Sequence, residues 1–176
     1  MANQVKPIPD GYSTVTPGLA LDGAAKAIEF YKKAFGATDA HECMKGPDGK
    51  IMHAELKIGS SVVMLSDAMP QMGCPATKSR FYVYVEDCDA LLARAVKAGA
   101  KLDMPATDMF WGDRMGSVSD QWGNVWSIST HKEDLSPEQV REGLGLVVDA
   151  RSAQLSAHVL RGELSDGLAL IGSVRD

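Results

Sequence analysis

The sequence predicts an α+β fold made of two βαβββ modules. The order strand, helix, strand, strand, strand occurs twice, about 63 residues apart. The two predicted helices end alike, in Phe35-Gly36-Ala37 and Ala98-Gly99-Ala100. Each half is too small to bury a sheet alone, so the halves must pack on each other or on a second chain.

Residues 1–10, with two prolines, form an extended lead-in to the first module, which covers 11–67. β-branched residues predict its first strand, in which Pro17 favours an edge or bulged position. Asp22 is expected to cap a helix whose apolar residues recur at helical spacing, and Gly36 to end it. The expected elements are a strand over 12–21, a helix over 23–35, and strands over 38–45, 51–58 and 61–67.

Residues 68–78 contain two prolines, a glycine and no periodicity, which indicates a linker. The second module is expected over 79–131, with Asp87 as the cap of its helix. Its expected elements are strands over 80–85, 100–106, 114–119 and 124–130, and a helix over 88–98. In the remaining segment, 132–176, Ser136 and Pro137 start a helix that is expected to end near Gly143, and residues 144–176 are left unassigned.

Composition restricts the function. The chain is 45% hydrophobic and 23% charged with a net charge of −5, which is ordinary for a globular protein and argues against a nucleic-acid partner. No apolar stretch is long enough to cross a membrane, and no signal peptide is readable at the N-terminus. Three cysteines at irregular spacing indicate neither a disulfide framework nor a zinc ribbon. We therefore expect a cytoplasmic protein with no nucleic-acid or membrane partner.

Four stretches together resemble the glyoxalase/bleomycin-resistance group, the vicinal oxygen chelate superfamily, and within it the PhnB-like branch. They are "TPGLALDGAAKAIEFYKKAFGA", "KIMHAELKIGSSVVMLSD", "VEDCDALLARAVKAGAKL" and "MFWGDRMGSVSDQWGNVWSISTHKEDLSPEQ". The resemblance implies a curved, mostly antiparallel sheet around a cavity, commonly in a homodimer. It leaves the function open, because the superfamily holds metal-dependent enzymes as well as metal-free proteins that sequester antibiotics.

The resemblance also places the superfamily's usual divalent-metal ligands. Carried over to this chain, the four positions fall on Thr16, Met64, Arg80 and Ser127, none of which is a good ligand for a transition metal. We therefore expect no cofactor at the usual site. A displaced site is the alternative, with His53 and Glu55 as the fallback ligands because they share one strand face.

All three tryptophans lie within residues 109–126. We expect Trp126 to pack as core and the turn at Asp120 to be structural. The connection holding Trp111 and Arg114 is read either as a stabilised turn or, as we favour, as the mouth of the cavity. Strand parity places further side chains inside the cavity, with Arg80 as a buried counter-charge and two phenols as partners. The predicted ligand-binding residues are Thr16, Met64, Arg80, Tyr82, Tyr84, Trp111, Arg114 and Ser127.

Two functions of different class remain open from the sequence. One is a metal-independent protein that binds a small organic molecule, anionic or aromatic, and performs no chemistry. The other is a lyase, isomerase or dioxygenase with a displaced metal site. A third, weaker interpretation is a protein whose pocket is vestigial and whose function depends on its dimer surface. The sequence does not decide whether the protein is an enzyme, and it names no ligand or catalytic residue.

Overall fold

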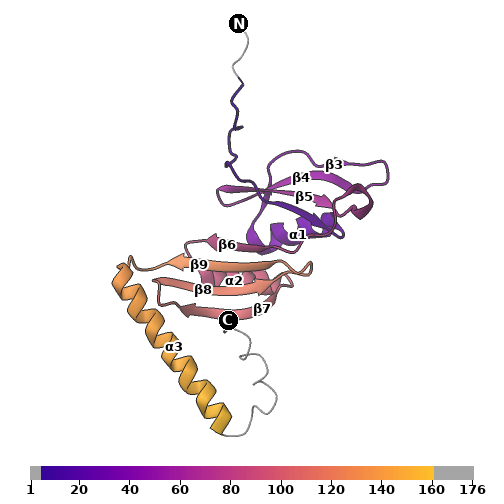
Figure 1. Ribbon diagram of the computed structural model, residues 1–176. Coiled ribbons are helices and arrows are strands. Elements are labelled where there is room, and N and C mark those ends of the chain that lie inside the picture. Colours follow the sequence, from indigo (N-terminus) through magenta and orange to yellow (C-terminus); the bar gives the residue numbers. More distant parts are fainter. Residues whose placement is uncertain (1–4, 161–176) are drawn as a thin grey trace, which may run out of the picture. The chain divides into compact units, whose positions relative to one another are not determined.

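The computed structural model describes residues 5–160, and within α3 the side chains only as far as Ala153. Its first sheet has the strand order β1-β5-β4-β2, with the short β3 also paired to β4 (Figure 1). Strands β1 and β5 run parallel, whereas β4 and β5 form an antiparallel hairpin. The strands are β1 (Gly18–Leu21), β2 (Thr38–Asp39), β3 (Met44–Lys45), β4 (Ile51–Ile58) and β5 (Ser61–Asp67).

The second sheet has the order β6-β9-β8-β7 and repeats the same plan. Its edge strand β6 runs parallel to β9, and β7 pairs with β8 in the antiparallel sense. The strands are β6 (Arg80–Tyr84), β7 (Lys101–Asp108), β8 (Asp113–Ser119) and β9 (Val125–His131). A short 3-10 helix, Pro70–Met72, lies in the connection between the sheets. The predicted α+β class is confirmed, as two mixed sheets.

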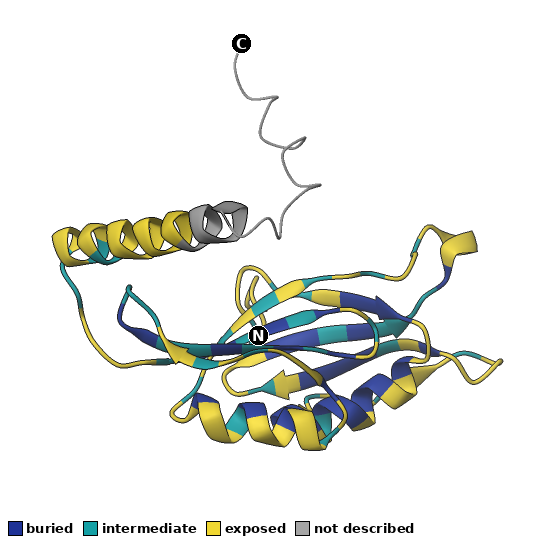
Figure 2. Cartoon of the chain, turned by 90° about the horizontal axis from the view of Figure 1, so that it is seen from below, coloured by how far each residue is buried: buried dark blue, intermediate teal, exposed yellow. Residues whose placement is uncertain are grey.

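Helices α1 (Ala24–Phe35) and α2 (Cys88–Lys97) have one buried and one exposed face, as Figure 2 shows. Both pack in one continuous core with the sheets. Asp87 caps α2 as predicted, since its carboxylate accepts a hydrogen bond from the Ala90 amide at 2.9 Å. The predicted cap of α1 is wrong. Asp67, at the end of β5, accepts from the Gly23 and Ala24 amides, and no side chain of the preceding turn caps the helix.

The core is centred on a buried carboxylate. Asp120 lies in the turn between β8 and β9 and accepts hydrogen bonds from the Tyr31 hydroxyl at 2.8 Å and from Trp126 Nε1 at 3.1 Å. It also accepts from the backbone amides of Trp122 and Asn124, and from the Asn124 side chain. Burial, together with the neighbouring Asp120 charge, raises the pKa of Tyr31 well above its ordinary value. The predicted structural role of this turn and the burial of Trp126 are confirmed.

Two strands differ from prediction. The expected strand over 12–21 contains regular structure only at Gly18–Leu21, because Pro17 has no N–H to pair and ends the ladder. The expected strand over 38–45 is two short strands, Thr38–Asp39 and Met44–Lys45, joined by an irregular segment. That segment brings His41 Nε2 to 3.6 Å from Glu55 Oε2 on β4.

The chain divides into two compact units. The larger unit contains both sheets, α1 and α2. The smaller one combines the connection Met109–Asp113 with Lys132 onward, including α3 (Pro137–Leu160). The predicted helix end near Gly143 is wrong, because Gly143 lies inside α3 at close approach to Phe110 and does not break the helix. In this unit the Gly112 carbonyl accepts hydrogen bonds from the Lys132 and Glu133 amides.

Candidate functional site

The larger unit contains a cleft of about 670 Å³. It lies where the β4–β5 hairpin meets strand β6 and helix α2, and apolar and aromatic side chains make up most of its wall. A cleft of this size suits a small organic molecule. Its side-chain lining includes Phe35, Ile58, Ser60, Ser61, Val63, Phe81, Tyr82, Val83, Tyr84, Leu91, Arg94 and Trp126.

Two of the predicted ligand-binding residues, Tyr82 and Tyr84, line this cleft together. They occupy alternate positions of β6, so both rings lie on the same face of the strand. The ring centroids are 5.1 Å apart, and the two residues are 48% and 62% exposed. The Tyr82 hydroxyl donates to Ser129 Oγ at 3.2 Å, which fixes the ring on the sheet. The cleft thus presents two adjacent aromatic surfaces.

Arg80 and Ser127 lie on the same sheet but are not in the cleft wall. Ser127 is the register partner of Tyr82 and is half-buried. Arg80 is exposed, so its predicted burial as a counter-charge is wrong. It is the first residue of an edge strand, where a long cationic side chain can reach solvent. Because Arg80 is exposed, its charge does not require an anionic ligand as a partner.

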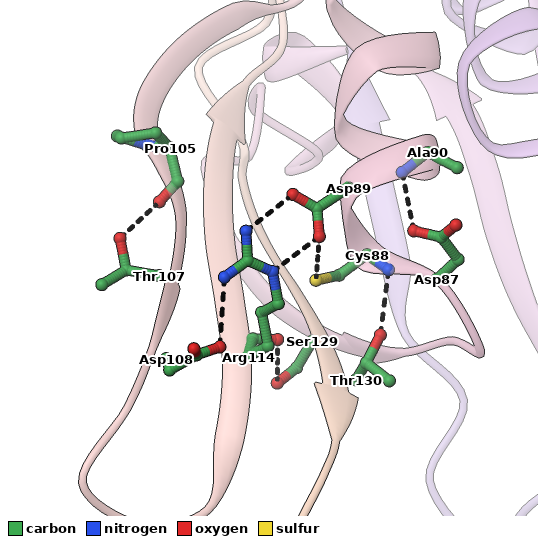
Figure 3. Close-up of polar contacts among 10 residues, drawn as sticks. All are labelled: Asp87, Cys88, Asp89, Ala90, Pro105, Thr107, Asp108, Arg114, Ser129 and Thr130. Carbon is green, nitrogen blue, oxygen red and sulfur yellow. Dashed lines mark hydrogen bonds and ion pairs between the residues drawn. The ribbon is translucent and has the colours of Figure 1, made fainter.

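Arg114 is held by carboxylates (Figure 3). Its guanidinium donates to both oxygens of Asp89, at 2.7 and 2.9 Å, and to Asp108 at 3.1 Å. Hydrogen bonding from Arg114 holds the pKa of Asp89 below its ordinary value, and the same contacts raise the pKa of Arg114. These contacts tie the start of α2 to the β7–β8 hairpin. Arg114 is therefore placed as a structural cation.

Trp111 belongs to the smaller unit. Its indole N–H donates to Asp113 at 3.2 Å, and its ring meets Phe110 edge-on with centroids 4.9 Å apart. Asp113 is buried. These contacts lie within the connection itself, and the wall of the cleft contains none of its residues.

Arg94 is a cleft residue that the sequence analysis did not single out. Its guanidinium donates to the backbone carbonyls of Lys33 at 2.7 Å and Lys32 at 3.2 Å. These are carbonyls of the last turn of α1, where a cation is favoured. Arg94 therefore joins α2 to α1, and its side chain also borders the cleft. A helical position among exposed charges gave no signal of this role.

The first sheet brings together the predicted Met64 and the fallback pair. Met64 is opposite Glu55 in the β4–β5 ladder, and His53 Nε2 lies 2.8 Å from Glu55 Oε1. Two residues that the sequence analysis did not place here complete the group. The Tyr12 hydroxyl donates to Glu55 Oε2, and His41 Nε2 lies 3.6 Å from the same oxygen. Thr16 is not part of the group; its hydroxyl donates to the Ser13 carbonyl.

Glu55 is a buried carboxylate, with 8% of its side chain exposed. Burial by itself raises the pKa of Glu55, but hydrogen bonds from Tyr12 and His53 and the two imidazoles outweigh it and lower the pKa below its ordinary value. The hydrogen bond to Glu55 correspondingly raises the pKa of Tyr12. Glu55 is therefore ionised at neutral pH.

The residues do not fit the superfamily's usual metal. A hydroxyl, a thioether, a guanidinium and a second hydroxyl occupy the four carried-over positions, a set without imidazole or carboxylate. Among the residues that the structure describes, no group of three or more His, Cys, Asp or Glu side chains is arranged to hold an ion. At His53 and Glu55 a direct hydrogen bond takes up the facing atoms.

No helix in the described part of the chain combines the length and apolar character that crossing a bilayer requires.

Comparisons agree with this architecture. An uncharacterized protein of Mycobacterium bovis is 37% identical over 142 residues, covering 74% of this chain and 91% of the relative. YjdN of Escherichia coli is 27% identical over 143 residues, 68% of this chain and 96% of YjdN. The crystal structure of TioX from Micromonospora sp. ML1 has a TM-score of 0.56 at 28% identity, covering 68% of this chain and 98% of TioX.

TnmS3, an antibiotic-binding protein from Streptomyces sp. CB03234, shares the fold with a TM-score of 0.52 at 22% identity, covering 69% of this chain and all of TnmS3. The sequence pattern of one superfamily matches residues 15–128. With two βαβββ sheets, a ligand-sized cleft and this match, the chain belongs to the glyoxalase/bleomycin resistance protein/dioxygenase superfamily.

Proposed function

We propose that this protein binds a small, largely apolar aromatic molecule in the cleft beside β6, without the superfamily's usual metal ion. The observation behind the proposal is the pair Tyr82 and Tyr84, which are exposed on one face of the edge strand β6. Their ring centroids are 5.1 Å apart, and both residues line the cleft of about 670 Å³. Aromatic rings offer a large contact area and stack on planar ligands. Superfamily members bind small molecules, as the antibiotic-binding TnmS3 illustrates.

The polar groups of the cleft support an aromatic rather than a strongly charged ligand. Ser60, Ser61 and the tyrosine hydroxyls can each hydrogen-bond a ligand. The acidic Asp87 and the basic Arg94 also border the cleft, so their charges offset one another. Both already have structural partners, in the α2 cap and in the last turn of α1.

We also propose that the working form is a homodimer. In the described sheets, β1 pairs only with β5 and β6 pairs only with β9, so each sheet ends in an edge strand. Such edges are open to pairing with another chain. Sedimentation velocity on the purified protein distinguishes a dimer from a monomer.

The test is a thermal-shift screen of the purified protein against aromatic compounds, followed by calorimetry on each hit. Tyr84→Ala removes one exposed ring and should lower affinity about tenfold, since an aromatic contact contributes about 0.5–1.5 kcal/mol beyond its buried area. Tyr12→Ala is the matched control, because Tyr12 is half-buried outside the cleft. Equal loss in the two variants contradicts the proposal. Stoichiometric transition metal by elemental analysis contradicts its metal-free part.

A further inference from the structure

The turn that contains Asp120 holds one tryptophan ring at the surface of the larger unit. The backbone amide of Trp122 donates to Asp120 Oδ1 at 3.0 Å, and its indole Nε1–H donates to the Asp22 carbonyl at 2.8 Å. The ring packs against Phe30 and Tyr31, with centroids 5.8 and 6.0 Å away, and remains partly exposed. Its orientation is therefore fixed and its N–H is satisfied, so the surface that it still offers a ligand is aromatic.

Two hollows border this ring, and neither shares a residue with the cleft beside β6. The first, of about 490 Å³, lies between the outer face of α1, the residue that follows α2 and the turn. The second, of about 350 Å³, lies between the end of β1, residues 76–78 and the turn. Lys26, Gln121 and Trp122 border both, so the two hollows lie next to one another. We call them the Trp122 hollows, and their size suits a molecule of one or two rings.

Lysine side chains give the Trp122 hollows a positive charge balance. Lys26 borders both hollows, Lys33 the first and Lys78 the second. All three lysines are exposed, and no ion pair between described residues includes any of them. The acids at the hollows are Asp22 and Glu29, and Glu29 already has an ion pair with a lysine of its own helix. An anion would therefore meet unpaired cations here, although the whole chain has a net charge of −5.

The fold determines where these lysines lie. Lys26 and Lys33 are two turns apart on α1, so they share one exposed face of the helix. The Lys78 chain lies against the turn, because a Cβ added at Gly123 would be 3.3 Å from Lys78 Cε. Gly123 thus leaves room for the methylenes of Lys78, whose charged end can remain in solvent. Two helical lysines and one from the connecting segment are therefore gathered around one indole.

We propose that the Trp122 hollows form a second binding site, for planar aromatic anions. The ring of the ligand packs on the exposed part of the Trp122 indole, and its anionic group is held by Lys26, with Lys33 or Lys78 as a further cation. An exposed ion pair alone is weak, and so is stacking on one partly exposed ring, so the site requires both features in one molecule. This site takes a charged ligand, unlike the cleft, and does not depend on the function proposed for the cleft.

The probe is 2-naphthoate, whose carboxylate is ionised at neutral pH. In isotope-labelled protein it should shift the NMR signals of the Trp122 indole N–H and the Gln121 backbone N–H in a saturable way. 2-Naphthamide has the same rings without the charge, and cyclohexanecarboxylate has the charge without an aromatic ring. Each should bind this site about three- to tenfold more weakly, because each lacks one of the two contacts.

Charge reversal supplies the matched variants. Lys26→Glu should weaken the binding of 2-naphthoate about tenfold, because it replaces an attraction by a repulsion. Lys57→Glu makes the same change in net charge at an exposed position of β4 outside both hollows, so the affinity should change by less than about twofold. Tyr84→Ala changes the cleft and should leave this titration intact. Thermal unfolding of each variant confirms that it is folded.

Several results would overturn the proposal. One is a titration in which 2-naphthoate shifts no signal of Trp122 or shifts only signals of the cleft, which leaves the function proposed for the cleft standing. Another is equal affinity for 2-naphthoate and 2-naphthamide at this site. Equal losses in Lys26→Glu and Lys57→Glu, or loss of the Trp122 shifts in Tyr84→Ala, contradict it as well.

Discussion

Replacing Asp120 by alanine tests whether the buried carboxylate organises the core and, through Trp126, the wall of the cleft. The substitution leaves the Tyr31 hydroxyl and Trp126 Nε1 without their acceptor, and it leaves Asn124 Nδ2 with only the Tyr31 oxygen at 3.3 Å. All three residues are at most 1% exposed. A buried donor without a partner costs about 1–3 kcal/mol, and the substitution affects several such donors at once.

We therefore expect Asp120→Ala to lower the free energy of unfolding by about 3–5 kcal/mol. With a urea slope of about 1–3 kcal/mol per molar, the midpoint should fall by about 1–5 M. Asp120→Asn keeps the shape but replaces one acceptor oxygen by a donor, so we expect a smaller loss. Equilibrium urea unfolding followed by tryptophan fluorescence measures both variants, since Trp122 and Trp126 lie around the turn.

Asp108→Ala is the control for Asp120→Ala. Asp108→Ala also removes a hydrogen bond, the one from Arg114. The Asp108 side chain is 80% exposed, however, so the urea midpoint should barely move. If the two alanine variants shift the midpoint equally, the buried network does not organise the core and the reasoning is wrong. A fall in the cleft's ligand affinity for Asp120→Asn, measured where the variant is fully folded, would further connect the network to Trp126.

Three other outcomes are expected. The lowered pKa of Asp89 means that its contact with Arg114 stabilises the fold above the ordinary pKa range of an aspartate, and this contribution is lost as pH falls through the lowered pKa, so Asp89→Asn should flatten the acid limb of a stability–pH curve. In Gly112→Ala, a Cβ would lie 2.2 Å from the Glu133 carbonyl oxygen at a residue whose φ is +94°. Because Glu133 lies shortly before the start of α3, this clash should disturb α3 and reduce the helix signal in circular dichroism. Gly145→Ala meets no atom within 4 Å and should instead stabilise α3 by about 0.5–1 kcal/mol, raising its helicity; a decrease would contradict the exposed placement.

Local sequence patterns determined the elements whose signals are local. The hairpin strands Ile51–Ile58 and Ser61–Asp67 lie at the predicted residues, and α2 starts at the predicted residue after its Asp87 cap. Alternation along β6 correctly separated Tyr82 and Tyr84 from the core residues Phe81 and Val83. These features depend on side-chain periodicity and on turn chemistry, which act within a few residues.

Tertiary structure decided the contacts that join distant residues. The cap of α1 comes from Asp67, which is 44 residues from Gly23 in sequence and meets it only because β1 and β5 run side by side. Tyr12 is 43 residues from Glu55 in sequence, and its hydroxyl donates to Glu55 only because the fold brings the segment before β1 to β4. The pairing of Arg114 with Asp89, where a ligand role was predicted, likewise depends on how α2 packs on the second sheet. A chain's periodicity fixes which face a residue occupies, whereas the partner on that face is set by packing between elements.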